Sequence, residues 1–141
     1  MPSFVIDTGA AVVEGDVVSL YESVGWTAYT RDAALLMRAI SRSSFVATAR
    51  EEDGRLLGLV RAVSDDTTIC YVQDLLVRPD VQRTGIGRAL VAEVLTRFGT
   101  LRQIVLMTDD EARQRAFYQS LGFVEGADLP GGPLRAFLRI G

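Results

Sequence analysis

The stretch that most constrains the fold of this chain is VRPDVQRTGIGRAL, residues 77–90. It follows TTICYVQDLLV (67–77), a very apolar run typical of a buried strand, which Pro79 brings to an end. It leads into GRALVAEVLTRFG (87–99), where apolar side chains recur every four positions along one face of a helix. Strand, glycine loop and amphipathic helix in this order predict a right-handed crossover to a parallel strand, with the helix packed on the sheet.

Turn signals and hydrophobic periodicity divide the rest of the chain into strands and helices. Strands are predicted at 4–8, 44–52, 55–64, 67–77 and 103–108, helices at 16–25, 30–43 and 109–122, and final strands at 123–127 and 134–140. Asp53-Gly54 is a hairpin signal, and Thr30 is expected to cap the second helix. This order predicts a single domain over residues 1–141, of the α+β class, with a mixed, mostly antiparallel sheet and helices on both faces.

The basic residues exclude several kinds of chemistry, because all 15 are arginine and the chain has neither histidine nor lysine. Histidine triads, histidine zinc sites, Schiff-base lysines and the lysine of P-loops are therefore ruled out. The net charge of −3 argues against a nucleic-acid partner and suits a cationic small molecule better than an anionic one. The pairs Asp65-Asp66 and Asp109-Asp110 are interpreted as a turn and a helix start, so no metal is expected.

The sequence carries no feature that directs it to a membrane or out of the cell. No apolar run approaches the roughly 18 residues of a membrane helix. The first residues do not have the pattern of a signal peptide. The single cysteine, Cys70, excludes an internal disulfide and is expected in the core. We therefore expect a cytoplasmic protein without a membrane partner.

The loop glycines, Gly85 and Gly87, bare the backbone amides at the start of the predicted helix. These amides carry partial positive charge, and Arg83 and Arg88 add full charges, so the loop suits a diphosphate. A P-loop needs a lysine, and a dinucleotide fingerprint needs a small residue where Leu90 stands. The pattern QRTGIG fits the coenzyme A diphosphate loop of acyltransferases, and a glycine turn feeding an ordinary helix is the structural alternative.

Two segments of the chain resemble motifs of one enzyme family. VQDLLVRPDVQRTGIGRALVAEVL resembles the acetyl-CoA motif of the GNAT superfamily of N-acetyltransferases, and RAFYQSLGF (115–123) resembles the helix that follows it. The resemblance covers residues 44–140, and LYESVGWTAYT before them is similar to small bacterial members, some of aralkylamine type. It implies an enzyme that transfers an acetyl group from acetyl-CoA to a primary amine, either a small molecule such as an aralkylamine or a protein amine.

The resemblance also implies where acetyl-CoA binds. In the family, the strand equivalent to 71–77 carries a bulge and splays from the next parallel strand at the centre of the sheet, which admits the pantetheine arm. The strand backbone would then bond pantetheine and the thioester oxygen, and the loop backbone would hold the diphosphate. The strand residues are Leu75, Leu76 and Val77, and the loop residues are Gln82, Arg83, Thr84, Gly85, Ile86, Gly87 and Arg88.

Tyr118 occupies the position of the family's tyrosine near the sulfur, where it would act on the leaving thiolate. A phenol with a pKa near 10 is a weaker acid than a thiol near 8.5, so a hydrogen bond to the developing charge describes this role better than full proton transfer. Packing beside Phe117 in the core is the structural alternative. Where many members have an asparagine that contacts pantetheine, this chain has Glu111, which puts that contact in question.

An amine acceptor with a pKa near 10.4 must lose a proton before it attacks, which costs roughly 4.6 kcal/mol at pH 7. A nearby carboxylate acting through water lowers this cost, and without histidine the candidate bases are Asp74 and Glu22. Asp74 stands in an apolar strand, where pairing with arginine or backbone is the alternative; a solvated helix charge is the alternative for Glu22. Tyr21, Trp26 and Tyr29 would either line the acceptor site or pack together.

Two other functions fit the sequence. A non-catalytic acyl-CoA-binding module with a regulatory or interaction role would bind the same cofactor without releasing free thiol. A nucleotide-binding regulatory domain would bind ATP instead. An exposed C-terminal strand would support a homodimer through edge pairing.

Overall fold

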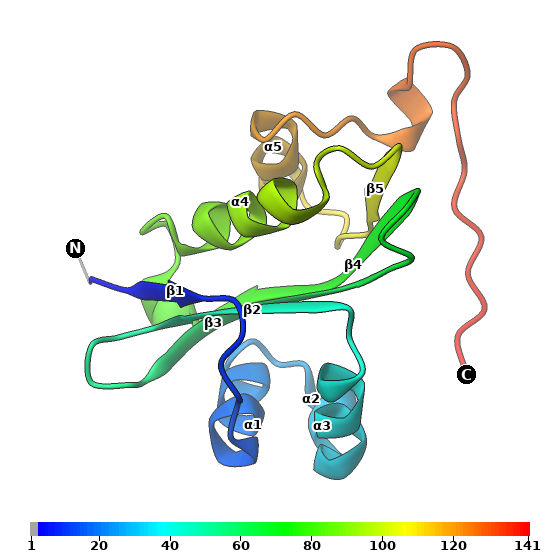
Figure 1. Cartoon of the computed structure of the whole chain (residues 1–141). Helices are drawn as coiled ribbons and strands as arrows, with labels where there is room; N and C mark the ends of the chain where they lie inside the picture. Colours follow the sequence, from blue (N-terminus) through cyan, green and yellow to red (C-terminus); the bar gives the residue numbers. More distant parts are fainter. Residues whose placement is uncertain (1–2) are drawn as a thin grey trace. The chain divides into compact units, whose positions relative to one another are not determined.

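The computed structural model describes residues 3–141, which form two compact units. The first unit ends at Leu106 and holds the whole sheet with four helices, and the second begins at Met107 (Figure 1). Within residues 3–141, no helix is long and apolar enough to span a bilayer. The single domain over 1–141 stays a prediction.

Five strands form one sheet in the order β1-β2-β3-β4-β5. They are β1 (Val5–Asp7), β2 (Phe45–Arg50), β3 (Leu56–Ser64), β4 (Ile69–Val77) and β5 (Gln103–Leu106). The first four pair antiparallel and β4 pairs with β5 in parallel, which confirms the predicted mixed, mostly antiparallel sheet. The parallel pair lies at one edge of this sheet rather than at its centre, because no strand follows β5 within residues 3–141.

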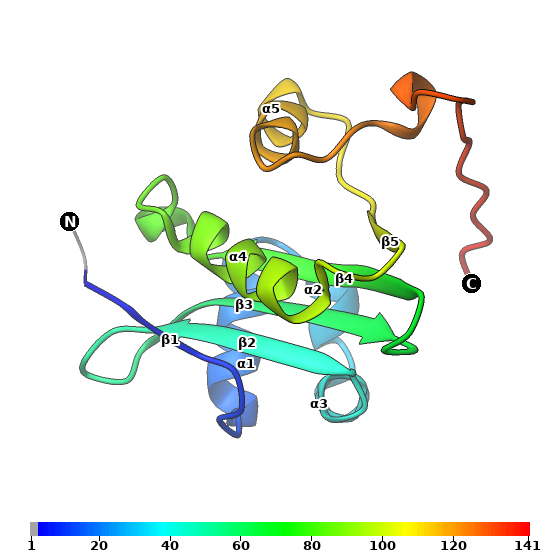
Figure 2. The ribbon, with the colours of Figure 1, turned by 45° about the horizontal axis from the view of Figure 1, so that its top comes forward.

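Helices cover both faces of the sheet, as predicted (Figures 1 and 2). On one face lie α1 (Glu14–Ser23), α2 (Thr27–Thr30) and α3 (Ala33–Ser41), and on the other lies α4 (Ile86–Phe98). The crossover from β4 through α4 to the parallel strand β5 is therefore present, as the glycine-loop sequence predicted.

The cap of the second predicted helix differs from the prediction. The segment 30–43 divides, because Thr30 ends α2 and α3 begins only at Ala33. The cap is Asp32, whose carboxylate accepts a 3.0 Å hydrogen bond from the backbone N–H of Leu35. The prediction of Thr30 as cap was wrong, since an aspartate two residues later offers a charged and therefore stronger acceptor for the free amides.

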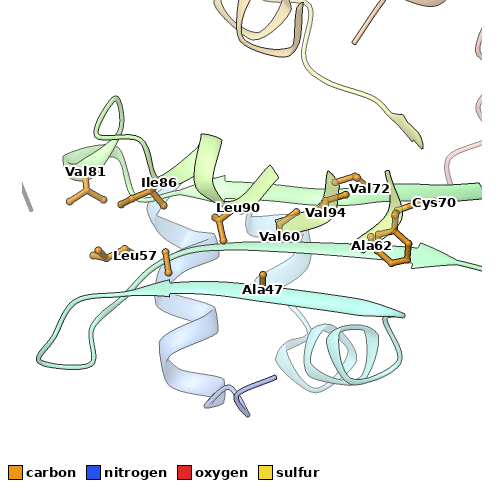
Figure 3. Close-up of a cluster of buried hydrophobic side chains, with 12 residues drawn as sticks. Ala47, Leu57, Val60, Ala62, Cys70, Val72, Val81, Ile86, Leu90 and Val94 are labelled. Carbon is orange, nitrogen blue, oxygen red and sulfur yellow. The ribbon is translucent and has the colours of Figure 1, made fainter. Parts of the chain in front are cut away.

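Two hydrophobic clusters pack on the two faces of the sheet. Figure 3 shows the cluster beneath α4, which includes Leu90 and Val94 of the helix and Val60 of β3. Cys70 is buried in this cluster, as expected for a core residue. The second cluster joins α1 and α3 to the opposite face of the sheet.

The helix α4 packs tightly against the sheet where β3 has a glycine, Gly58. A Cβ at this position would lie 3.1 Å from the Cγ2 of Ile86 and 3.2 Å from the Cδ1 of Leu90. It would also lie 3.0 Å from the carbonyl oxygen of Leu76 in β4. The missing side chain therefore sets the distance between the sheet and the first turn of α4, where the glycine loop ends.

The strand β4 carries the bulge that the resemblance implied. In the register with β3, Asp74 pairs with Arg61 but Val72 pairs with Ala62, so Gln73 is an extra residue. Because side chains alternate along a strand, one extra residue moves those that follow to the opposite face. Val72 consequently packs in the cluster beneath α4, whereas Asp74 contacts side chains of α1 and α2.

The second unit contains one regular helix, α5 (Ala112–Ser120). It ends as predicted at Gly122, whose φ of +91° is the left-handed conformation that glycine adopts readily. Hydrogen bonds from the backbone N–H of Phe123 to the carbonyl of Tyr118, and from Gly122 to that of Gln119, close the last turn. Arg115 then ties the helix to the following segment through a 2.6 Å ion pair with Glu125.

The two final strands predicted at 123–127 and 134–140 do not form within the described residues. A short 3-10 turn, Gly126–Asp128, replaces part of the first. The second runs as an extended chain (Figure 1) in which Phe137 and Ile140 are 89% and 83% exposed. The prediction of strands at 123–127 and 134–140 was therefore wrong, because a strand needs a neighbouring strand to pair with.

Candidate active site

The loop between β4 and α4 presents backbone amides to open space. Gly85 has a φ of +94°, and an added Cβ would meet no atom within 4 Å. The first hydrogen bond of the helix runs from the N–H of Ala89 to the carbonyl of Gly85 at 3.0 Å. The amides of Ile86 and Gly87 precede this bond, so they have no acceptor of their own in the helical ladder. The arrangement suits an anion at the start of α4.

Side chains of the loop hold its shape. The hydroxyl of Thr84 donates to the carbonyl of Val81 at 2.6 Å, and the amide of Gln82 donates to the carbonyl of Val77 at 3.0 Å. Arg83 takes a φ of +65°, a left-handed conformation that is uncommon for a residue with a side chain. Arg83 and Arg88 are both exposed and add positive charge beside the amides.

The strand β4 has an edge that lacks a strand partner over part of its length. It pairs with β5 from Ile69 to Val72 only, while it continues to Val77. The backbone N–H of Arg78 donates to the carbonyl of Leu57 in β3 at 2.8 Å. Because backbone groups alternate in direction along a strand, those of Leu75 and Val77 point away from β3, toward the unpaired edge.

The third predicted strand residue, Leu76, has a different environment. It pairs with Leu59 of β3, and the alternation directs its backbone groups to that strand. Its side chain is 3% exposed in the cluster with α1 and α3. The geometry therefore favours Leu75 and Val77, rather than Leu76, as backbone partners for a ligand along the open edge.

A buried carboxylate, Asp74, lies one residue beyond the bulge and is 2% exposed. Its Oδ1 accepts from the hydroxyl of Tyr29 at 2.8 Å. Its Oδ2 accepts from the hydroxyl of Tyr21 at 2.9 Å and from the Nε of Arg61 at 2.6 Å. Of the alternatives left open by the sequence, these contacts match a carboxylate satisfied by arginine.

The charges of this network support one another. Burial lowers the pKa of the Arg61 guanidinium, but the charge of Asp74 and the hydrogen bond to it outweigh burial and raise that pKa overall. Burial, followed by the negative charge of Asp74, raises the pKa of the Tyr21 hydroxyl. Burial is also the main cause that raises the pKa of Tyr29. All three donors therefore keep their protons at neutral pH.

The aromatic rings of this face pack edge to face or tilted against one another. The ring centroids of Tyr21 and Tyr29 are 5.3 Å apart, and those of Trp26 and Tyr29 are 6.1 Å apart. Trp26 and Tyr29 are half-buried, so part of each ring faces outward. Glu22, the second candidate base, is exposed near the end of α1, whereas its neighbour Tyr21 turns toward the sheet.

Tyr118 lies on α5 in the second unit. Its ring packs edge to face against Phe117, with centroids 5.0 Å apart, and against Phe123 at 5.8 Å. Burial raises the pKa of Tyr118 to about 12. Glu111, at the position where an asparagine was expected, is the exposed residue that precedes the first turn of α5.

Sequence reasoning missed Arg61 as part of the site. The signal was an arginine inside the apolar run RLLGLVRAVS, which would place a buried charge in need of a partner. The partner could not be found from sequence spacing, because the bulge at Gln73 decides that Arg61 faces Asp74. The contacts of Tyr29 with Asp74 and Gln73 depend on the same register.

Comparison with known proteins agrees with this geometry. Residues 41–125, more than half of the chain, match the acetyltransferase (GNAT) domain. The chain therefore belongs to the GNAT acetyltransferase family. A GNAT-family acetyltransferase from Streptococcus pneumoniae has a similar structure, with a TM-score of 0.80 and 33% identity over 98% of this chain and 100% of that chain.

Two further proteins are similar to this chain, one in structure and one in sequence. An aminoglycoside N-acetyltransferase solved in complex with CoA matches with a TM-score of 0.73 and 16% identity, over 99% of this chain and 95% of that chain. An uncharacterised N-acetyltransferase of Gracilaria tenuistipitata is 30% identical over 118 residues, which are 80% of this chain and 63% of the relative. The chain thus spans less than two thirds of the length of such curated relatives.

Proposed function

We propose that this chain transfers an acetyl group from acetyl-CoA to a primary amine. The observation that carries the proposal is that β4 leads from an unpaired strand edge directly into the amide-presenting loop. An extended ligand with amide groups at one end and a diphosphate at the other fits this succession. Acetyl-CoA has that structure, and it would supply the activated acetyl group.

The backbone of the chain would bind most of the cofactor. The outward N–H of Val77 and the backbone groups of Leu75 would bond the pantetheine arm as an added strand does. The amides from Gln82 to Arg88 would hold the diphosphate, with Arg83 adding charge. The open space beside Gly85 and its positive φ, which glycine adopts most readily, support this fit.

Tyr118 would donate a hydrogen bond to the sulfur as the thiolate leaves. Because its pKa is about 12 and that of a thiol is near 8.5, full proton transfer would be uphill by roughly 5 kcal/mol. A hydrogen bond to the developing charge has no such cost. The role follows from the family's motif, which this helix matches.

The acceptor that we propose is an aryl-alkylamine, and a protein amine is the alternative. The half-buried rings of Trp26 and Tyr29 support an aromatic acceptor, since rings of this kind bind apolar and cationic groups. Asp74 is neutralised by Arg61, so the cluster offers no spare carboxylate for a polyamine. Glu22 stays a candidate base acting through water, because it is exposed on the helix beside this cluster.

The test measures free thiol release from acetyl-CoA in the presence of 2-phenylethylamine, spermidine and a lysine peptide. We expect release with 2-phenylethylamine above the rate without amine. Binding of acetyl-CoA without release for any amine would favour the non-catalytic module. Protection by ATP but not by acetyl-CoA would favour a nucleotide-binding domain.

A variant tests the diphosphate loop directly. Gly87→Glu places a negative charge among the loop amides and should weaken acetyl-CoA binding at least tenfold by calorimetry. Gly15→Glu, in the first turn of α1 where an added Cβ meets nothing, is the matched control. Equal affinities for the two variants would refute the loop as the diphosphate site.

A further inference from the structure

Tyr29 is the one partner of Asp74 in this network that also reaches an exposed residue. Its hydroxyl donates to Asp74 at 2.8 Å and accepts from the amide Nε2 of Gln73 at 3.0 Å. Gln73 is exposed and Tyr29 is half-buried, whereas Tyr21 and Arg61 are buried. The network therefore extends from the interior to the outer side through Tyr29.

The hydroxyl of Tyr29 has one hydrogen-bonding capacity left. A phenol carries one proton and two lone pairs. The proton is committed to Asp74, and one lone pair accepts from Gln73. Donation to a carboxylate polarises a hydroxyl and makes its oxygen a stronger acceptor. The remaining lone pair suits an N–H donor.

The hydroxyl oxygen of Tyr29 lies beside the unpaired edge of β4, through its hydrogen bond with Gln73. Gln73 is the bulge residue, and the unpaired edge of β4 begins there, since pairing with β5 ends at Val72. Leu75, whose backbone groups point toward this edge, follows two residues later. Because Tyr29 bonds Gln73, its hydroxyl lies beside the start of this edge, within reach of a group that binds there.

We propose that the hydroxyl of Tyr29 binds the amino group of the acceptor by accepting an N–H hydrogen bond, and that Asp74 with Arg61 positions this hydroxyl rather than acting as the base. The proposal rests on the proposed acetyltransferase function and deepens it. As a base, Asp74 would become neutral on taking up a proton, and the buried Arg61 charge would lose its charged partner.

The groups that face one another here are Asp74, Arg61, Tyr21 and Tyr29. Burial is the main cause that keeps the pKa of Tyr29 above its usual value. The hydrogen bond from Gln73 lowers this pKa, and the charge of Asp74 raises it. Tyr29 therefore stays protonated and serves as a fixed acceptor, not as a base. The proton of the amine would leave by another route, through water.

The test compares two variants that each remove one hydroxyl from the same carboxylate, Tyr29→Phe and Tyr21→Phe. Calorimetry measures binding of 2-phenylethylamine to protein saturated with CoA, a complex without turnover, and steady-state kinetics give KM and kcat. For Tyr29→Phe we expect Kd and KM for the amine to rise about five- to tenfold, as for one lost hydrogen bond, with CoA affinity within twofold. For Tyr21→Phe we expect a lower melting temperature and a rise in amine Kd below twofold.

Equal effects of the two variants on amine affinity would overturn the proposal, because a purely structural hydroxyl would behave alike at both positions. An unchanged amine Kd in Tyr29→Phe would also overturn it. Wild-type protein that binds CoA but not 2-phenylethylamine would overturn the assignment of Tyr29 to this acceptor. Failure of the wild type to bind CoA would refute the proposed function itself.

Discussion

At the scale of single residues, the chain places opposite charges inside its core. The Nε of Arg61 and the Oδ2 of Asp74 are 2.6 Å apart, with side chains only 9% and 2% exposed. Removal of one member of such a pair leaves a buried charge without a partner, which is strongly destabilising. The two tyrosine hydroxyls donate two further hydrogen bonds to the carboxylate, so each of its oxygens has a partner.

Asp74→Asn tests this dependence. Neutralising the carboxylate leaves Arg61 charged and buried, so the free energy of unfolding should fall by about 3–5 kcal/mol. Asp80→Asn removes the partner of Arg55 from a pair in which both side chains are well exposed, and it should change stability little. Urea unfolding of both variants measures the difference. Equal midpoints would show that the buried pair is not needed for stability.

Tyr118→Phe tests the proposed role of the phenol. The ring and its packing against Phe117 and Phe123 are retained, so only the hydrogen bond to sulfur is lost. We expect kcat to fall about tenfold, the equivalent of roughly 1.4 kcal/mol, with acetyl-CoA affinity unchanged. Tyr71→Phe, which removes a hydroxyl from β4 in the parallel-paired region, is the control. Equal kcat values for the two variants would remove Tyr118 from the mechanism.

At the scale of elements, the contact between β3 and α4 positions the glycine loop. Gly58 lets the first turn of α4 approach the sheet, and that turn carries the amides of Ile86 and Gly87. The bulge at Gln73 lies in the neighbouring strand β4, where it turns the side chain of Asp74 to the α1–α3 face of the sheet. Both elements of the site therefore depend on backbone features rather than on reactive side chains.

Gly58→Ala should disturb this contact. The new Cβ would lie 3.0 Å from the carbonyl oxygen of Leu76 and 3.1 Å from the Cγ2 of Ile86, so these tightly packed neighbours must move apart. We expect a loss of about 1–3 kcal/mol in stability together with weaker acetyl-CoA binding. Gly15→Ala in α1, where an added Cβ meets nothing, should instead stabilise the protein by about 0.5–1 kcal/mol. Thermal unfolding and calorimetry would check both, and unchanged behaviour of Gly58→Ala would contradict the assigned role.

At the scale of the whole molecule, the second unit leaves apolar side chains uncovered. Leu134, Phe137, Leu138 and Ile140 are between 56% and 89% exposed along one extended segment. Side chains of this size and number in a row mark an interaction surface. We propose that a second copy of the chain covers them, in line with the homodimer expected from the sequence.

Light scattering after gel filtration tests the dimer. The wild type should elute with twice the mass of one chain, and Phe137→Ser/Ile140→Ser should shift it toward the monomer. Val63→Ser removes an exposed apolar side chain, 51% exposed, from β3 and should leave the mass unchanged. A monomeric wild type at micromolar concentration would refute the dimer.

The sequence predicted most elements of the first unit for local reasons. The spacing of apolar residues predicted the buried face of α4, and Asp53-Gly54 predicted the hairpin between β2 and β3. The glycine loop predicted the crossover from β4 to β5. Tertiary contacts decided the features that these local patterns did not predict. Asp32 rather than Thr30 caps the helix that follows. The segments 123–127 and 134–140 form no strands in the described residues, because they have no partner strand.

The amino-acid sequence by itself determined that backbone amides at the start of α4 would be bared, because glycine and helix geometry are local properties. It also determined which residue types were available for chemistry, since no histidine or lysine is present. Only the tertiary structure decided what Asp74 does. The extra residue Gln73 shifts the register by one, and that shift places the carboxylate against Arg61, Tyr21 and Tyr29, which are distant in the chain.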